Sequence, residues 1–167
     1  MNIPFVDLNR ETLIIKDLFQ KGLDSILENS NFVGGSYIAD FEERFSIMHE
    51  FDKVISCGNG TDAIMIALRA LGIRPGDEVI VPAQTWISTA SAVNAIGAKP
   101  VFCDIDQYNC IDPQHLKGVL TEKTRAIIAV HLYGMPAKMD DIVEFCKLNN
   151  LFLIEDCAQA HLAKYNS

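Results

Sequence analysis

The sequence predicts an α/β fold in which a mostly parallel sheet carries helices on both faces, preceded by two N-terminal helices. From about residue 51, short apolar runs alternate with segments of helical spacing, which is typical of βαβ units. The apolar runs stop abruptly at glycine, proline or polar residues, as buried parallel strands do. We therefore expect an N-terminal helical arm over residues 1–50 and a sheet domain of about five strands over residues 51–167.

Length and composition are those of a globular protein. A chain of 167 residues fits one domain of ordinary size, and its apolar runs are too short to span a bilayer. The N-terminus lacks the layout of a signal peptide, so we expect a cytoplasmic protein. The five cysteines form no CxxC pair, which favours reduced thiols over disulfides or zinc. The net charge of −8, without a basic cluster, makes nucleic acids and anionic membranes poor partners.

The N-terminal part is expected to begin with an extended segment over residues 1–9. Residues 10–28 carry apolar side chains at helical spacing, which predicts an amphipathic helix. Residues 29–36 form a turn that includes two adjacent glycines, and residues 37–49 form a second helix. The apolar positions are Leu13, Ile14, Leu18, Leu23, Ile26 and Leu27 in the first helix and Ile38, Phe41, Phe45 and Met48 in the second.

The sheet domain is expected to contain five strands separated by helices. Pro82 stops the second strand, Gly97 ends one helix, and Pro113 lies in the first turn of another. The predicted strands cover residues 53–57, 78–81, 99–103, 125–130 and 151–154. The predicted helices cover residues 63–71, 86–96, a segment that opens at Asp112, and residues 139–149.

The carboxyl ends of these strands bring candidate functional residues to one edge of the sheet, where ligands bind in open α/β folds. The first strand leads into a glycine-rich turn with Gly60, Thr61 and Asp62. Backbone N–H groups at a helix N-terminus, together with a threonine hydroxyl, suit a phosphate. The alternative is a tight turn with Thr61 or Asp62 as the N-cap. The turn matches neither the Walker motif nor the GxGxxG fingerprint.

The next three strands deliver further candidates. Trp86 follows the second strand and offers a flat face to an aromatic ligand, although a tryptophan that covers the core is the alternative. Asp104 and Asp106 follow the third strand, and His131 follows the fourth. These groups and Asp156 would have to converge to hold a metal, and no HxH, HxxxH or HExxH spacing supports that, so we expect none. A lone histidine in this position is more often a hydrogen-bonded structural residue.

The last strand ends at Asp156, with Gln159 three residues further on. A helix N-cap is the simple explanation of such an aspartate. A site that joins a phosphate, a flat ring and this acid, however, fits pyridoxal 5'-phosphate. An aspartate beside a pyridine nitrogen keeps that nitrogen protonated, and the protonated ring is an electron sink. Gln159 could then hydrogen-bond the phenolic oxygen of the ring.

Several segments together resemble the DegT/DnrJ/StrS sugar aminotransferases, which are fold-type I pyridoxal phosphate enzymes. The segments appear in the family's order and cover nearly the whole chain. They are residues 3–8 (IPFVDL), 32–35 (FVGG), 59–63 (NGTDA), 75–83 (PGDEVIVPA), 97–102 (GAKPVF), 130–134 (VHLYG) and 155–161 (EDCAQAH).

The resemblance implies a role for each matching residue. Gly60, Thr61 and Asp62 match the turn that binds the cofactor phosphate, and Trp86 matches the aromatic residue that stacks on the ring. Asp156 matches the partner of the ring nitrogen, and Gln159 matches the amide near the ring hydroxyl. His161 matches a frequent family residue to which we assign no role.

The resemblance also implies an activity. The family transfers an amino group, usually from glutamate, to a nucleotide-linked keto-sugar in the biosynthesis of surface polysaccharides or deoxyamino sugars. It works as a dimer, with the active site near the subunit interface. The Schiff-base lysine of the family is expected beyond Ser167, so no catalytic residue is assigned here and we expect this chain alone to be inactive.

Two departures from the family pattern affect the expectations. Leu162 stands where the family usually has glycine. The family's sheet order is 3-2-4-5-6-7-1, and its strands six and seven are expected beyond Ser167. The first strand of this chain would then have no neighbour, and the fifth would have an open apolar edge, so poor stability or self-association is expected. The alternatives are a non-catalytic remnant that binds the cofactor or a full-length relative, or a dehydratase or regulator of the same fold.

Overall fold

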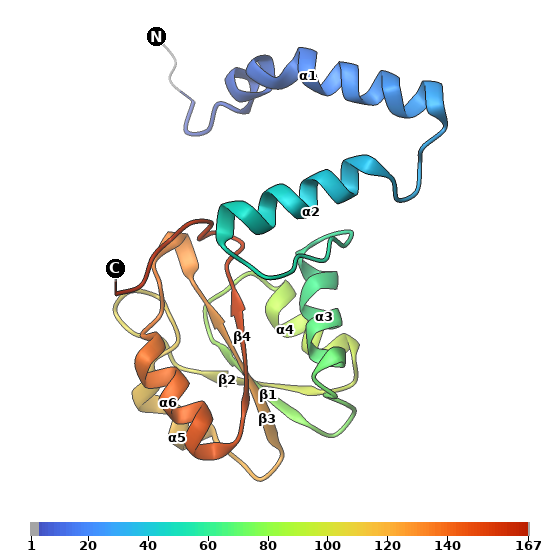
Figure 1. The fold of residues 1–167 in the computed structure, drawn as a ribbon. Coiled ribbons are helices and arrows are strands. Elements are labelled where there is room, and N and C mark those ends of the chain that lie inside the picture. Colours follow the sequence, from blue (N-terminus) through green and yellow to red (C-terminus); the bar gives the residue numbers. More distant parts are fainter. Residues whose placement is uncertain (1–3, 167) are drawn as a thin grey trace. The chain divides into compact units, whose positions relative to one another are not determined.

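A computed structural model describes residues 4–166, and it divides the chain into two compact units, Met1–Ser56 and Cys57–Ser167. Residues 1–3, the beginning of the predicted extended segment, lie outside the described part. Each unit is described by itself (Figure 1). The predicted division between residues 50 and 51 stays a prediction about domain organisation.

The first unit contains two helices, α1 (Leu8–Asn29) and α2 (Ser36–His49). Asp7 caps α1, since its carboxylate accepts the N–H of Arg10 at 3.1 Å. The predicted helices are therefore confirmed, but neither helix contains a buried residue. Large apolar side chains lie exposed along both: Leu13, Ile14, Leu18 and Phe19 on α1 and Ile38, Phe41 and Met48 on α2.

The strand predicted over residues 53–57 is wrong, because these residues form no strand. A strand requires a neighbour for its backbone groups. The N–H of Ser56 instead donates to the carboxylate of Glu42 at 2.8 Å, and the Ser56 hydroxyl donates to the same oxygen at 2.7 Å. The carboxylate of Glu42, on α2, thus accepts a backbone N–H that a neighbouring strand would otherwise pair with.

The second unit alternates helices and strands as expected. Its strands are β1 (Glu78–Pro82), β2 (Lys99–Cys103), β3 (Thr124–Val130) and β4 (Phe152–Asp156). Its helices are α3 (Gly60–Ala70), α4 (Ser88–Ala95), α5 (Pro113–Val119), the short 3-10 helix η1 (Leu132–Gly134) and α6 (Met139–Asn149).

The sheet of the described residues has four strands in the order β2-β1-β3-β4, and every pair is parallel. Four strands replace the expected five, because residues 53–57 are unpaired. The order of the remaining strands is the predicted one, 3-2-4-5. The register of β3 against β4 sets Val130 beside Asp156, so both strands end at one edge.

Two apolar clusters confirm that helices cover both faces of the sheet (Figure 1). Alternate residues of β1 enter different clusters. Val79 and Val81 pack with side chains of α3 and α4, and Ile80 packs with side chains of α5 and α6. β1 is buried along its whole length, which explains why its residues 79–82 are apolar without alternation.

Within residues 4–166, no helix has the length and apolar character needed to cross a membrane.

Candidate functional site

A cavity of about 330 Å³ lies in the second unit, where β3 and β4 end. It is bounded by the beginning of α3, the loop after β1, the first turn of α4 and the segment after β4. Its lining residues are Asn59, Gly60, Thr61, Ile64, Thr85, Trp86, Ser88, Thr89, Val130, Leu132, Asp156, Ala158 and Gln159. Gly60, Thr61, Trp86, Asp156 and Gln159 are thus brought together as the sequence suggested.

The glycine-rich turn forms the N-terminus of α3, but its cap differs from the expectation. Asn59 is the N-cap, and its side chain accepts the N–H of Asp62 at 3.0 Å. The alternative of Thr61 or Asp62 as N-cap is therefore wrong. The Thr61 hydroxyl donates to the Ser88 hydroxyl at 2.8 Å, which joins α3 to α4 beside the cavity.

Of the six predicted cofactor-binding residues, Asp62 alone does not line the cavity. Its carboxylate accepts from the Asn59 amide at 2.9 Å. Asp62 therefore supports the cap, and the positive end of the α3 dipole is offered to the cavity by Gly60 and Thr61.

Trp86 lines the cavity and is 74% exposed. A tryptophan that covers the core would be largely buried, so that alternative is wrong. The flat face of this indole is open to a ligand.

Asp156 is the last residue of β4, and its carboxylate is half-buried at the cavity. One carboxylate oxygen, Oδ1, accepts the N–H of Ala158 at 3.1 Å. No helix follows within the described residues, so the N-cap alternative is wrong. The second oxygen is the group that Asp156 can offer to a positively charged or N–H donor ligand.

The direction of the Gln159 amide follows from a single contact. Its Oε1 accepts the backbone N–H of Tyr133 at 2.9 Å. A backbone N–H can only donate, so the oxygen of the amide is assigned without ambiguity. The amide nitrogen, a donor, is what Gln159 offers to a ligand.

His131 is buried next to the cavity, on the opposite face of the sheet edge from Asp156. Its Nε2 lies 3.1 Å from Oε2 of Glu155, and its Nδ1 accepts the N–H of Ala137 at 3.0 Å. The expectation that this histidine is hydrogen-bonded is confirmed. The partner Glu155 was missed, although alternation along β4 could have separated it from Asp156.

These contacts determine which ring nitrogen of His131 carries a proton. Cys157 and then Glu155 raise the pKa of His131, because both stabilise the charged ring, but the contact at Nδ1 opposes that charged form. A second proton would occupy Nδ1, which already accepts the Ala137 N–H, so two donors would face each other. We therefore assign the neutral ring with its proton on Nε2. The contact with His131 lowers the pKa of Glu155.

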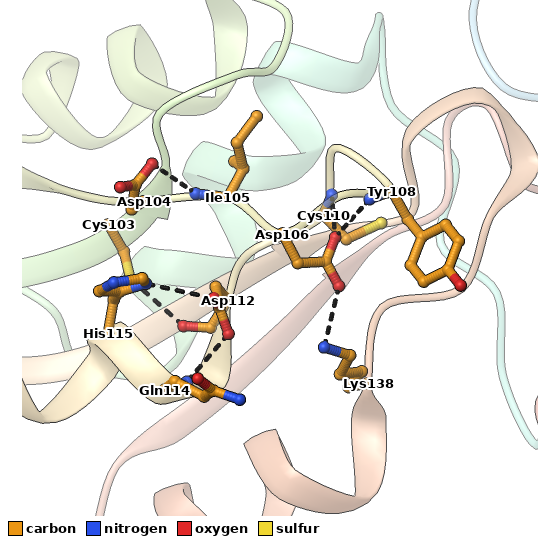
Figure 2. A network of polar contacts seen from close by, with 10 residues as sticks. All are labelled: Cys103, Asp104, Ile105, Asp106, Tyr108, Cys110, Asp112, Gln114, His115 and Lys138. Atoms are coloured by element: carbon orange, nitrogen blue, oxygen red, sulfur yellow. Dashed lines mark hydrogen bonds and ion pairs between the residues drawn. The ribbon is translucent and has the colours of Figure 1, made fainter.

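Asp104 and Asp106 do not line the cavity. Figure 2 shows the contacts that they make instead. Asp106 Oδ1 accepts the N–H groups of Tyr108 and Cys110, and its Oδ2 pairs with Lys138 Nζ at 3.3 Å. Asp104 accepts the N–H of its neighbour Ile105 at 2.9 Å. Both carboxylates stabilise the loop after β2. They do not converge with His131 and Asp156 on a shared metal site.

Among the described residues, one group has metal-ligating atoms close together: His131, Glu155 and Cys157, within 4.8 Å of one another. The expected absence of a metal stays a prediction. His161 is exposed and does not line the cavity.

Comparison with known proteins places the chain in a family. The model of the DegT/DnrJ/EryC1/StrS aminotransferase family matches residues 13–167. A pleiotropic regulatory protein of Geobacillus stearothermophilus is 45% identical over 99% of this chain and 45% of its own length. The UDP-N-acetyl-3-dehydro-α-D-glucosamine 3-aminotransferase of Acidithiobacillus ferrooxidans is 42% identical over 98% of this chain and 45% of its own.

The fold agrees with these relatives. The NtdA protein of Bacillus subtilis, solved with the cofactor PMP bound, superposes with a TM-score of 0.89 at 37% identity, over 97% of this chain and 38% of NtdA. The chain spans slightly less than half the length of the curated relatives described above. The chain belongs to the DegT/DnrJ/EryC1/StrS aminotransferase family.

Proposed function

We propose that the cavity binds pyridoxal 5'-phosphate or its amine form, pyridoxamine 5'-phosphate. The observation that carries this proposal is the match between the lining groups and the polar atoms of the cofactor. The N-terminus of α3 with Gly60 and Thr61 suits the phosphate, and Trp86 suits the face of the ring. Asp156 has one carboxylate oxygen left for the protonated ring nitrogen.

The Gln159 amide provides an independent test of the fit. Its oxygen is occupied by Tyr133, so it presents a donor to the cavity. The phenolic oxygen of the cofactor is an acceptor, and the two are complementary. A ligand with a donor in that position would leave two N–H groups facing each other. Asp62 is proposed to act indirectly, through the cap of α3.

We propose that the protein to which these residues belong transfers an amino group from glutamate to a nucleotide-linked keto-sugar. Pyridoxal phosphate, when bound, supplies the electron sink that such a transfer needs. The residues of this chain bind and orient it: Asp156 holds a proton at the ring nitrogen, and Trp86 excludes water from one face. No lysine lines the cavity of the described residues, and the Schiff-base lysine expected beyond Ser167 stays a prediction.

The relatives support the substrate class, because the Acidithiobacillus relative is named for an amino transfer to a nucleotide-linked sugar. A regulatory role is a second candidate, favoured by the regulatory protein that is 45% identical. The expected homodimer is supported by the exposed apolar side chains of α1 and α2. A cytoplasmic location stays a proposal.

Titration with pyridoxamine 5'-phosphate, followed by its fluorescence, tests the cofactor site. We expect saturable binding by the 167-residue chain and a loss of roughly 10- to 100-fold in affinity for Asp156→Asn, because a charge-assisted hydrogen bond is lost. The matched control is Asp104→Asn, which changes a carboxylate that directly follows β2 and lies outside the cavity, and it should bind like the wild type. Absence of saturable binding, or equal affinity of Asp156→Asn and wild type, would overturn the proposal.

A further inference from the structure

His131 connects the segments that carry Asp156 and Gln159. It follows β3 directly, and its backbone N–H donates to the carbonyl oxygen of Asp156 at 3.1 Å. Its ring contacts Glu155 on β4 through Nε2 and Ala137, beyond η1, through Nδ1. The side chain is only 7% exposed, so these contacts are protected from water.

The turn between these anchor points has an uncommon shape. Tyr133 lies in the left-handed region at φ 56° and ψ 23°, and Gly134 follows at φ 86°. A non-glycine residue in this region costs on the order of 1 kcal/mol, so the surrounding contacts must hold it there. In this shape the N–H of Tyr133 points at Oε1 of Gln159.

We propose that His131 is a positioning residue that fixes the Gln159 amide with its nitrogen toward the ligand. Nδ1 holds the N–H of Ala137 and thereby closes the turn, and the closed turn presents the Tyr133 N–H to Gln159. The bond from Nε2 to Glu155 anchors the ring to β4, one residue before Asp156. His131 itself does not line the cavity and acts through Gln159. The consequence for ligand binding rests on the proposed cofactor site.

A metal held by His131, Glu155 and Cys157 is the competing explanation of the same cluster. A histidine that binds a metal through Nε2 carries its proton on Nδ1 and donates it to an acceptor. Here Nδ1 faces a backbone N–H, which is a donor. The hydrogen bonds therefore favour the positioning role.

Two amide substitutions separate the contacts of the ring. His131→Asn places an acceptor near the position of Nδ1, whereas His131→Gln reaches toward Glu155 and lacks that acceptor. Both variants bury one amide, so their difference reports the Ala137 contact. His115→Asn, at an exposed histidine that pairs with Asp112, is the control for histidine substitution as such.

Amide hydrogen exchange of Tyr133, measured by NMR without ligand, tests the positioning directly. We expect exchange at least roughly fivefold faster in His131→Gln than in wild type, and within about twofold of wild type in His131→Asn and His115→Asn, because a broken hydrogen bond exposes the N–H. Equal exchange in all four proteins, or equal acceleration in the two His131 variants, would overturn the inference.

Binding of pyridoxamine 5'-phosphate tests the path through Gln159. We expect His131→Gln to weaken binding roughly tenfold in the wild-type background and less than about twofold in a Gln159→Ala background, because coupled residues are non-additive. Equal losses in both backgrounds would contradict a role through Gln159. If the wild type does not bind, the cofactor proposal fails, and the exchange measurement still decides the positioning role.

Discussion

Leu162 shows how a single residue carries local strain in this chain. It lies at φ 62°, in the left-handed region that favours glycine, and its side chain is 57% exposed. The glycine that the family resemblance implies at this position would adopt this conformation without strain. Little apolar burial offsets the strain at this position.

Leu162→Gly is therefore expected to stabilise the second unit by roughly 0.5–1 kcal/mol, since relief of the left-handed strain exceeds the added entropy of the unfolded chain. Urea unfolding followed by circular dichroism measures the change. Leu148→Gly is the control, because Leu148 is also exposed but lies in α6, where glycine should cost about 1 kcal/mol. A loss of stability for Leu162→Gly would contradict the assigned strain.

At the scale of elements, hydrogen-bonded side-chain caps mark the beginning of α3 and of α5. Asn59 caps α3 at the cavity, and Asp112 caps α5 by accepting the N–H of Gln114 at 3.1 Å, away from the cavity. The two caps are chemically alike but differ in position. Removing each cap in turn therefore distinguishes an effect on helix stability, which both variants share, from an effect on ligand binding, which only the cap at the cavity can have.

Asn59→Ala and Asp112→Ala are each expected to cost about 1 kcal/mol of unfolding free energy, because an N-terminal N–H loses its acceptor. Only Asn59→Ala should also weaken the binding of pyridoxamine 5'-phosphate, since α3 offers its first N–H groups to the phosphate. Chemical denaturation and ligand titration measure the two effects. Equal effects of both variants on binding would argue against a phosphate at α3.

At the scale of the whole molecule, apolar surface stays uncovered in both units. Within the described residues, β4 pairs only with β3, and Phe152 at its beginning is 46% exposed. An open parallel edge presents unpaired backbone groups, which promote association. In the first unit, helices without a buried residue do not have the packing that stabilises most helices in proteins.

We therefore expect the isolated 167-residue chain to self-associate, with larger particles by sedimentation velocity at about 100 µM than at about 5 µM, because an exposed strand edge pairs with another chain. Phe152→Lys should reduce this association, as a charge at a strand edge opposes pairing. Tyr108→Lys, at an exposed residue of the loop after β2, should not. A monomer that melts reversibly and cooperatively at both concentrations would contradict the expectation.

The resemblance to the family implied the order of the strands that form. The patterns of the sequence itself determined the alternation of helices and strands and the edge where Gly60, Thr61, Trp86, Asp156 and Gln159 meet. These features follow from periodicity and from turn residues, which act within a few neighbours along the chain. Hence α6 begins and ends at the predicted residues, 139 and 149. Residues 53–57 have strand-like composition, yet pairing depends on a distant neighbour, and none is present among the described residues.

Only the tertiary structure decided which polar groups contact one another. Gln159 is oriented by Tyr133, His131 by Ala137 and Glu155, and these partners lie up to 26 residues apart. Hydrogen bonds between such distant groups leave no period in the sequence. They depend on the register of β3 and β4, which is set when the apolar faces of the sheet are buried. The residues of the site are thus readable from the chain, but the direction in which each presents its donor or acceptor is not.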